Sequence, residues 1–506
     1  MEEYILLPGA PDDDNRDYLP EKIKGSDIVV NENGNNSQPY PQRLEEFHDV
    51  LMPDGKQDTW YEYVPSCYDP SRKTPLVLSM HGGMMTGWGQ AIYTSWTMVA
   101  EMNNFIVVFP DASEKRVWCV EWGKWRFDDG EGVNEPLPPE ASNTPEDIME
   151  NHDIRLALGL IDRMREKYNI DEERIYMQGM SMGNLMTALF SRNFGSILAG
   201  AAGSGCSTFT DLLFTPEGVI KNKGGCLPVW QSRPENNDIP PGKSDSLYVN
   251  KYNRYYWMKL NRCAPIPQIS IVGEDNLAFY RGEKADMVYL DIKNRDHGQT
   301  LDDAALVWNY LFSGTRRKAD GTIAYEQSNL PRTGDAFAFA VADGCRSAWV
   351  HNALQPLTAE VRKWQKLKYH GLNGGQAVRG EYRMVPLSLL AHVFQAELSY
   401  AGNTLTAQMT LPDGRHLQFA RGSIGCVMDG RLRSMYCEAL HREGQILVSV
   451  EWFCRYLMNL TVTECDGVVY VTDHFAELSA NMADLIRDLL ANGGTPADYD
   501  ALTLEK

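Results

Sequence analysis

The sequence predicts an α/β chain, in which a doubly wound parallel sheet is followed by a second, smaller α+β domain built from a repeat. Short apolar runs alternate with helical stretches from residue 75 to residue 313, a pattern typical of parallel sheets that are buried on both faces. After residue 335, a strand–helix–hairpin pattern occurs twice, offset by about 64 residues. The 506 residues also exceed what one hydrophobic core accommodates, so more than one domain is expected.

The predicted sheet follows a polar lead-in, residues 1–40, which is rich in Asn, Asp, Pro and Gly and is expected to be loosely ordered. We assign residues 41–315 to the domain that holds the sheet. Its predicted strands are apolar or β-branched runs bounded by turn-forming residues. They cover residues 45–52, 60–64, 75–80, 105–110, 174–178, 268–272 and 287–292.

Helices are expected between these strands. Thr144 offers an N-cap, Pro145 a first helical position and Asp147 an acidic residue three positions after the cap. Apolar residues downstream return at helical spacing, so one face of this helix is predicted to pack on the sheet. Further helices are predicted to begin near Met182 and near Thr300.

The pattern changes after the predicted sheet domain ends. Residues 316–335 are polar, with Arg, Lys, Gly and Pro, and indicate a linker. Residues 336–475 contain the repeat, and each copy predicts a strand, a helix and a hairpin that turns at a Gly-Asn or an Asp-Gly dipeptide. Residues 476–506 are predicted as a short helical tail.

Charge and hydropathy argue against two classes of partner. The net charge is −20 and the pI is about 5.0, and such a surface repels nucleic acid and anionic membranes. No apolar run approaches the ~20 residues of a membrane span. The acidic N-terminus lacks a charged-then-apolar leader. We therefore expect either a cytoplasmic protein or a secreted one whose signal is not visible in this chain.

The cysteines give no sign of a metal site. All ten are scattered without a CxxC pair, so the spacing of zinc ligands is absent and no metal is expected. A few disulfides are compatible with the sequence, for instance one between Cys206 and Cys226, and their pattern stays open.

The strongest functional signal is the pentapeptide Gly179-Met180-Ser181-Met182-Gly183, which fits G-x-S-x-G. A predicted strand precedes it and a predicted helix follows it, which is the context of the nucleophile turn in α/β-hydrolases. The sharp turn lifts the serine Oγ above the sheet edge, and small neighbours avoid clashes there. The helix aims its N-terminal amides at the charge that develops during acyl transfer. Ser181 is therefore the predicted nucleophile.

Two further elements complete the expected machinery. His81-Gly82-Gly83 end an apolar strand, and α/β-hydrolases take one oxyanion amide from this loop and the other from the residue after the nucleophile. We expect the amides of Gly83 and Met182 to form the oxyanion hole, with His81 and Gly82 in the substrate site. His297 lies in a polar loop between a strand and a helix, where this fold places its general base.

The acid of the triad is expected between the serine and the histidine in the chain. The predicted strand 268–272 is followed by Gly273-Glu274-Asp275-Asn276. A carboxylate at such a strand end orients the histidine and stabilises its imidazolium form. Asp275 is the predicted acid, and Glu274 is the alternative.

Residues from about 60 to 313 resemble the esterase family of polyhydroxybutyrate depolymerases and bacterial feruloyl esterases. The resemblance is carried by Leu-Ser-Met-His-Gly-Gly at 78–83, by the helix that begins Asp-Ile-Arg at 153 and ends in Tyr-Asn-Ile-Asp-Glu-Glu-Arg at 168–174, and by Ile-Tyr-Met-Gln-Gly-Met-Ser-Met-Gly at 175–183. It implies an α/β-hydrolase fold and a serine esterase. The family's Asp-Asn pair aligns with Asp275-Asn276, which favours Asp275. Where the family commonly has Trp-Pro after its histidine, this chain has Gly298-Gln299.

Residues 336–475 resemble the copper amine oxidase N-terminal-like stalk module, in the strand-to-helix segment that begins Val-Pro-Leu at 385 and in the hairpin after it. The name implies no copper chemistry. Similar modules occur mostly in secreted or wall-associated chains. The resemblance therefore favours a secreted or cell-surface location and a cell-wall or carbohydrate contact through this domain.

A tryptophan-rich loop follows the strand 105–110 and contains Trp118, Trp122 and Trp125. Ligands of open α/β sheets bind at the carboxyl ends of the strands. We therefore expect these tryptophans to contact the substrate. The equal alternative is that they form a hydrophobic lid without substrate contact.

Together these residues predict a serine esterase that hydrolyses carboxylic esters through an acyl-enzyme and needs no cofactor. The expected substrates are small-molecule or polysaccharide-linked esters of ferulic acid, acetic acid or related aromatic acids. A polyhydroxyalkanoate-type polyester depolymerase is the alternative within this class. A cell-surface binding protein whose esterase domain is secondary or inactive is the alternative from another class.

Overall fold

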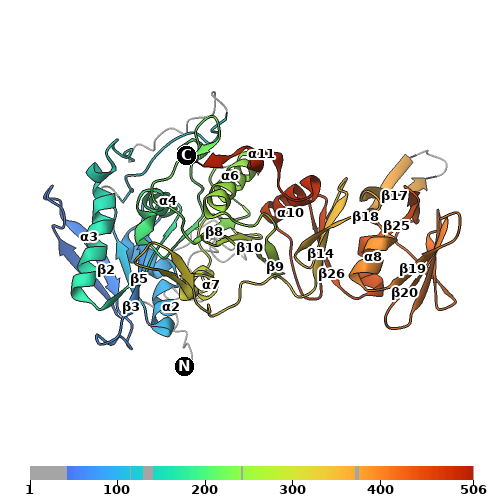
Figure 1. Cartoon of the computed structure of the whole chain (residues 1–506), viewed down its shortest axis with the longest axis horizontal. Coiled ribbons are helices and arrows are strands. Elements are labelled where there is room, and N and C mark those ends of the chain that lie inside the picture. Colours follow the sequence, from blue (N-terminus) through green and yellow to red (C-terminus); the bar gives the residue numbers. More distant parts are fainter. Residues whose placement is uncertain are drawn as a thin grey trace, which may run out of the picture. The chain divides into compact units, whose positions relative to one another are not determined.

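The computed structural model of the chain describes residues 43–113, 116–128, 141–236, 238–240, 243–370 and 375–504; the predicted lead-in, residues 1–40, lies outside them. The chain forms two compact units (Figure 1). The first contains the chain up to Ala264, Phe279–Arg332 and the residues from Ala501 on, and the second contains Pro265–Ala278 and Thr333–Asp500. In the part of the chain that is described, no helix is both long and apolar enough to cross a membrane.

The largest sheet has ten strands in the order β1-β2-β4-β3-β5-β6-β8-β11-β10-β9. The strands from β4 to β11 in this order are parallel, whereas β1 and β2 pair antiparallel. Along the chain, β4 is added on one side of β3, and β5 and β6 are then added on its other side. This reversal is typical of a doubly wound sheet, so the α/β-hydrolase sheet predicted from the sequence is confirmed. The bounds are β1 (Leu44–Asp49), β2 (Asp58–Tyr63), β3 (Thr74–Met80), β4 (Ile106–Pro110), β5 (Ile170–Met180), β6 (Gly200–Ser204), β8 (Val229–Pro234), β9 (Gln268–Val272), β10 (Asp275–Tyr280) and β11 (Met287–Ile292).

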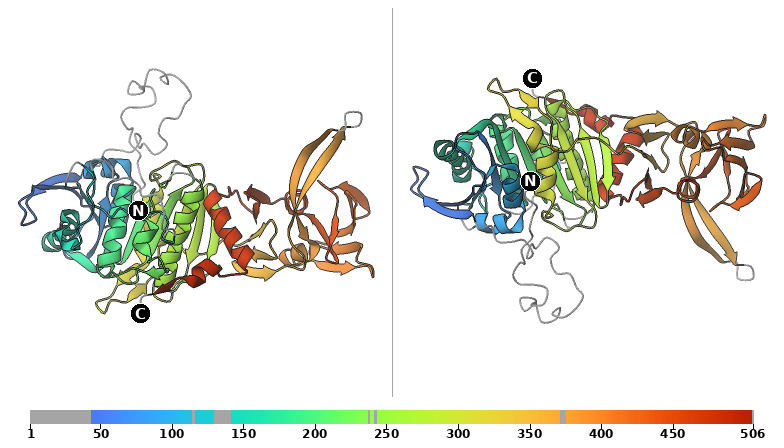
Figure 2. Two further views of the ribbon diagram at one scale, coloured as in Figure 1. Left: turned by 90° about the horizontal axis from the view of Figure 1, so that it is seen from above. Right: turned by 90° about the horizontal axis from the view of Figure 1, so that it is seen from below.

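Helices cover both faces of this sheet. Figure 2 shows α3, α4 and α6, in teal and green, over one face, and α2 and α7, in blue and yellow, over the other. The helices of the first unit are α1 (Gly87–Tyr93), α2 (Trp96–Asn103), α3 (His152–Lys167), α4 (Met182–Phe194), α5 (Thr210–Leu213), α6 (Lys243–Asn261) and α7 (Asp303–Tyr310), with short 3-10 turns at Ile148–Glu150, Gly195–Ile197 and Phe312–Gly314. A small two-stranded pair joins β7 (Val219–Ile220) to β28 (Thr503–Leu504).

The helix that was expected to begin after Thr144 begins at His152 instead. The side chain of Asn151 accepts hydrogen bonds from two amides of its first turn and caps it. Asp147 caps only the 3-10 turn Ile148–Glu150. Asp147 and Asn151 are both cap-forming residues, and α3 begins after Asn151, which directly precedes the residues that this helix buries.

Two strands of the parallel sheet, β6 and β8, are absent from the sequence prediction. β6 consists of small residues only, and the second half of β8 carries Gln231, Ser232 and Arg233. Both strands are nevertheless buried along their whole length. β6 lacks the apolar run that marks an interior strand because its residues are small. β8 lacks it because its second half is polar, and there Ser232 bonds with Trp230 and Asp303 while Arg233 donates to Asn250.

Residues 316–335, predicted as a linker, instead contain a hairpin of β12 (Thr315–Arg317) and β13 (Ile323–Tyr325). The buried guanidinium of Arg317 donates to several backbone carbonyl oxygens. The buried guanidinium of Arg332 pairs with a buried carboxylate at 2.8 Å. Two of the polar residues that suggest a linker, Arg317 and Arg332, therefore make buried hydrogen bonds.

The second unit consists mostly of β-strands, and the repeat is visible in it. One copy consists of β18 (Gly375–Pro386), α8 (Leu387–Val393) and β19 (Glu397–Tyr400). The other consists of β25 (Gln445–Ser449), α9 (Val450–Trp452) and β26 (Thr461–Cys465), and β18 and β25 pair antiparallel. Each copy ends in a hairpin, β19–β20 or β26–β27. At the second hairpin, Asp466 and Gly467 have φ of 49° and 80°, which fits the turn expected of an Asp-Gly dipeptide.

The strands of this unit are β14 (Ala338–Ala342), β15 (Ser347–Val350), β16 (Ala353–Pro356), β17 (Arg362–His370), β18 (Gly375–Pro386), β19 (Glu397–Tyr400), β20 (Thr406–Thr410), β21 (His416–Ala420), β22 (Gly425–Met428), β23 (Arg431–Ser434), β24 (Leu440–Arg442), β25 (Gln445–Ser449), β26 (Thr461–Cys465) and β27 (Val468–Thr472). Its helices are α8 (Leu387–Val393), α9 (Val450–Trp452), a π-helical turn at Phe453–Leu457, and α10 (Ala480–Asn492). The last helix, α11 (Ala497–Ala501), contains the C-terminal boundary of this unit, Asp500. The predicted helical tail thus consists of α10 and α11.

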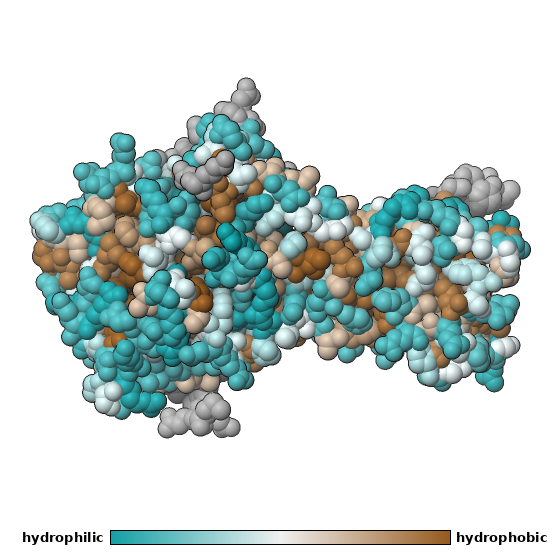
Figure 3. Space-filling model, in the orientation of Figure 1, coloured by the Kyte–Doolittle hydropathy of each residue, from teal (hydrophilic) through white to brown (hydrophobic). Residues whose placement is uncertain are grey.

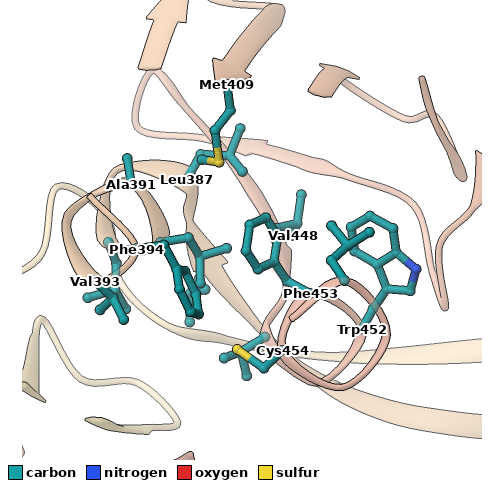
Figure 4. Packing of buried hydrophobic residues seen from close by; sticks show 14 of the residues in the cluster. Leu387, Ala391, Val393, Phe394, Met409, Val448, Trp452, Phe453 and Cys454 are labelled. Carbon is teal, nitrogen blue, oxygen red and sulfur yellow. The ribbon is translucent and has the colours of Figure 1, made fainter. Parts of the chain in front are cut away.

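The two copies share one hydrophobic core. Phe394, which ends the helix of the first copy, stacks on Phe453 of the second with ring centroids 5.5 Å apart. Figure 4 shows both rings among the buried side chains of this cluster, with Leu387, Val448 and Trp452 around them. A single repeat would leave half of this core open, which explains why the pattern occurs in a pair.

In the face shown in Figure 3, hydrophilic side chains predominate and apolar ones are interspersed among them. All ten cysteines carry free thiols, so Cys206 and Cys226 form no disulfide. Cys206 lies buried, where burial raises the pKa of its thiol to about 12.

Candidate active site

Ser181 lies at the sharp turn between β5 and α4. Its φ of 56° and ψ of −118° are rare for a residue with a side chain and mark a strained turn. The two flanking residues must be glycines for steric reasons. A Cβ at Gly179 would lie 2.0 Å from the carbonyl oxygen of Gly183, and a Cβ at Gly183 would lie 2.2 Å from the carbonyl oxygen of Met80. The G-x-S-x-G pattern thus places the serine hydroxyl at the carboxyl end of β5.

His297 faces Ser181 at this edge of the sheet. Its Nε2 lies 2.8 Å from Ser181 Oγ, which is a hydrogen-bond distance. Burial lowers the pKa of His297, and the negative charge of Asp238 acts in the opposite direction. A histidine with a lowered pKa is neutral at pH 7 and can accept the serine proton. The structure therefore brings the predicted nucleophile and the predicted base together.

The loop after β3 lies against the start of α4. A Cβ built on the exposed Gly83 would lie 3.7 Å from the Cβ of Met182. His81 anchors the loop: its Nε2 accepts a hydrogen bond from the Ala112 amide at 3.0 Å, and its Nδ1 donates to the Gly82 carbonyl oxygen at 2.6 Å. Burial lowers the pKa of His81 to about 4, which leaves the neutral ring that such a donor–acceptor pair needs.

This geometry corrects the expected role of His81. Its side chain has no exposed surface, so it does not contact a substrate. It fixes the backbone that presents Gly83. Gly82 is likewise buried, and the exposed part of the loop begins at Gly83.

The three tryptophans of the aromatic loop differ in exposure. Trp118 is fully buried, and its Nε1 donates to the His81 carbonyl oxygen at 2.8 Å. Trp125 is buried and stacks on Phe209 with ring centroids 3.9 Å apart. Trp122 is half-buried. The expected substrate contact is therefore wrong for Trp118, which bonds to the backbone of the loop after β3. Trp125 packs in the core, which leaves Trp122 as the candidate.

For the predicted acid, the arrangement in the structure differs most from the expectation. Asp275 is the first residue of β10 and, like Glu274, belongs to the second compact unit, whereas Ser181 and His297 belong to the first. Within the first unit, the strand between β6 and β11 is β8, and the loop after β11 carries His297. Asp238 follows β8, and its carboxylate interacts electrostatically with His297.

Asp238 is held by buried partners. Its side chain is 6% exposed. Its Oδ1 accepts a hydrogen bond from the Ile239 amide at 2.9 Å, and its Oδ2 lies 3.4 Å from Asn250 Nδ2. Burial raises the pKa of Asp238, and the positive charge of Arg233 opposes that effect. Arg233 is itself buried and donates from Nε to Asn250 Oδ1 at 3.0 Å, so one amide side chain connects the cation to the carboxylate.

Two adjacent loops carry Asp238 and His297. They follow β8 and β11, which pair in parallel, so both leave the same edge of the sheet. The amide of Glu235 donates to the last residue of β11 at 3.1 Å, and the amide of Asn236 donates to the histidine loop at 2.9 Å. These bonds hold the two loops side by side.

The sequence contains one signal that would have pointed to Asp238. It is a carboxylate that stands between Ser181 and His297 and precedes the long helix α6. Without β8 in the predicted sheet, the next predicted strand after the serine is 268–272, so the sequence predicts the acid after that strand and not at Asp238.

No protein-family model matches the sequence. Among curated proteins, the chain is 30% identical over 272 residues to a bifunctional acetylxylan esterase/xylanase of Neocallimastix patriciarum, a match that covers 52% of this chain and 34% of that protein. It is 25% identical over 147 residues to poly(3-hydroxyalkanoate) depolymerase C of Paucimonas lemoignei, which covers 28% and 30%. The chain thus spans about a third of the length of these relatives.

Solved structures similar to this chain include two esterases. An acetyl xylan esterase from Aspergillus awamori has a TM-score of 0.36 and 14% identity, and the match covers 53% of this chain and 98% of that one. A ferulic acid esterase from Anaeromyces mucronatus has a TM-score of 0.33 and 15% identity, with coverage of 56% and 92%.

Proposed function

We propose that this chain is a serine hydrolase of carboxylic esters that works through an acyl-enzyme. The observation that carries the proposal is the 2.8 Å hydrogen bond between Ser181 Oγ and His297 Nε2, on a strained turn at the end of a central strand. A serine in hydrogen-bond reach of a neutral histidine is the arrangement of an activated nucleophile. Similarity to an acetylxylan esterase/xylanase and to a polyester depolymerase supports esters as the substrate class.

The reaction has two steps. His297 Nε2 takes the Ser181 proton while Oγ bonds to the ester carbonyl carbon, and the carbonyl oxygen becomes an oxyanion against the amides of Gly83 and Met182. As this intermediate collapses, the bond to the alkoxy oxygen breaks, and His297 gives its proton to the leaving alcohol. Water then attacks the acyl-enzyme with the same proton transfers, which releases the acid and restores Ser181.

Asp238 is the acid of this triad, in place of Asp275. It is buried, it follows the strand beside that of the histidine loop, and its field acts on His297. A carboxylate in this position holds the imidazole in the correct tautomer and stabilises the imidazolium that forms. The donors and the cation around Asp238 favour its ionised form.

The substrates are acetyl or feruloyl esters of a xylan-type polysaccharide, with acetyl esters first. The similarity to an acetylxylan esterase/xylanase supports the polysaccharide. Acetyl is placed first because Trp118 and Trp125 point into the core and leave only Trp122 of the aromatic loop to stack on an aromatic acyl group. A polyester depolymerase is the second candidate, supported by the 25% identity to such an enzyme.

A substrate panel tests this proposal. Acetylated xylan, methyl ferulate, p-nitrophenyl acetate and a poly(3-hydroxybutyrate) suspension are incubated with the wild type and with Ser181→Ala. We expect release of acetate from the xylan and a loss of about 10³-fold or more in the variant. Preference for the polyester would favour the second candidate. A folded wild type that hydrolyses none of the four would contradict the enzyme assignment and favour the binding protein considered from the sequence.

A further inference from the structure

A chain of buried hydrogen bonds joins a residue three positions before Ser181 to a residue two positions after His297, and the proposed reaction does not use it. At its centre, Gln299 Nε2 donates to Gln178 Oε1 at 3.1 Å and to Asp303 Oδ2 at 2.8 Å. The exposed fractions of Gln178, Gln299 and Asp303 are 0%, 4% and 2%. Buried polar groups of this kind are costly unless they are paired, so their arrangement calls for a physical reason.

The chain continues in both directions from this centre. On one side, Gln178 Nε2 donates to Ser79 Oγ on β3. On the other side, Ser232 Oγ on β8 donates to Asp303 Oδ1 at 2.5 Å, and Trp230 Nε1 donates to Ser232 Oγ at 2.8 Å. The network therefore links β3, β5, β8 and the first residue of α7.

Each part of the network lies next to a part of the candidate site. Gln178 stands three residues before Ser181 on β5, and Gln299 stands two residues after His297. Ser232 lies on β8, and the loop after β8 holds Asp238. One amide group, that of Gln299, thus connects the nucleophile strand to the histidine loop, and Asp303 connects that loop to the strand that precedes Asp238.

The chemistry of Asp303 fits this role. Its two carboxylate oxygens accept from Ser232 and from Gln299, and burial raises its pKa to about 6. A carboxylate whose only role is to interact with the helix dipole can do so while exposed to solvent and does not need to be buried. The neighbouring Asp302, which is exposed at the same helix start, has that simpler position.

We propose that Gln299 and Asp303 are positioning residues, which hold the His297 loop against the nucleophile strand so that Nε2 stays within hydrogen-bond reach of Ser181 Oγ. The proposal rests on the proposed function, because it concerns the geometry of the same serine–histidine pair. In this position a small displacement of the loop is costly, since a misplacement of about 1 Å can reduce turnover by about 10²-fold.

Three variants test the proposal. Asp303→Ala removes both acceptors, Gln299→Leu removes the donor and keeps the bulk, and Asp303→Asn keeps the shape, since its Oδ1 can accept from Gln299 while its Nδ2 donates to Ser232 Oγ. Asp302→Asn is the matched control at the same helix start. Each is compared with the wild type for kcat and KM on p-nitrophenyl acetate, for the rate constant of fluorophosphonate labelling, and for Tm.

We expect Asp303→Ala and Gln299→Leu to lower kcat and the labelling rate by about 10- to 100-fold, with KM nearly unchanged. Asp303→Asn should recover most of the loss, and Asp302→Asn should behave as the wild type. Near wild-type kcat and labelling in folded Gln299→Leu would overturn the proposal, as would Asp303→Asn losing as much as Asp303→Ala. If Asp303→Ala does not fold, Gln299→Leu and Asp303→Asn decide.

The labelling rate separates this proposal from the proposed function. A wild type that is labelled at Ser181 but hydrolyses no ester refutes the assignment as an ester hydrolase, and the labelling rates of the variants still measure the positioning. A wild type that is neither labelled nor active contradicts both.

Discussion

Replacing Asp238 with asparagine tests the part of the site where the structure departs most from the sequence prediction. Asp238→Asn keeps the size of the side chain and the Oδ1 that accepts from the Ile239 amide, and it removes the negative charge that acts on His297. The fold should therefore survive while the imidazolium that forms during acyl transfer loses its counter-ion.

The expected size of the effect follows from the burial of the pair. Two unit charges about 4 Å apart attract by about 4 kcal/mol at an effective dielectric constant of about 20, which corresponds to about 10³-fold in rate. Loss of the correct histidine tautomer brings the reduction in serine triads to about 10⁴-fold. We therefore expect kcat of Asp238→Asn on p-nitrophenyl acetate to fall by about 10³- to 10⁴-fold, with a cooperative thermal transition retained.

Asp275→Asn and Glu274→Gln are the matched controls, because they carry the same chemical change at the positions favoured by the sequence. Both should keep kcat close to the wild-type value, since the negative charge that acts on His297 is that of Asp238. The reverse ranking, with Asp275→Asn severely impaired and Asp238→Asn active, would refute the assignment of Asp238.

Three other predictions concern the pH profile, the turn and the domain boundary. Because burial lowers the pKa of His297, the midpoint of the acid limb of the kcat/KM–pH profile should lie below the ordinary histidine pKa of about 6.5. Activity should therefore persist to lower pH and be lost as the histidine becomes protonated, and a midpoint above that value would contradict the lowered pKa. Gly183→Ala should lower the stability by about 1–3 kcal/mol, since its Cβ would lie 2.2 Å from a carbonyl oxygen, whereas Gly402→Ala, with nothing within 4 Å, should leave Tm nearly unchanged. A chain ended at residue 332 should be less stable than the full chain, because two amides of β9 lose their acceptors Asp335 and Asn352; an unchanged Tm would show that these bonds contribute little.

The proposed nucleophile and base are predictable from sequence because their requirements are local. The turn at Ser181 needs a strand before it, a helix after it and no side chain at Gly179 or Gly183, and all of these leave marks in neighbouring residues. His297 is found by its order in the chain and by the polar loop around it. The same holds for the parallel strands with apolar runs, such as β3 and β4.

The proposed acid, Asp238, escapes prediction because the strand before it, β8, carries polar residues in its second half although the whole strand is buried. Ser232 and Arg233 belong to hydrogen-bond networks that join β8 to Asp303 and to Asn250, and such partners lie far away in sequence. A pattern of apolar residues cannot reveal a strand whose interior is polar. The burial of His81 and Trp118 has the same origin, since each bonds to backbone groups that only the folded chain brings near.

The central claim is that Ser181 is an activated nucleophile, and mass spectrometry of the covalent adduct tests it most directly. The wild type and Ser181→Ala are treated with a fluorophosphonate at neutral pH, digested and mapped. We predict a single adduct on the wild type, located on the peptide that contains Ser181, and none on the variant. An unlabelled wild type that is folded, or an adduct on another residue that persists in Ser181→Ala, would contradict the account.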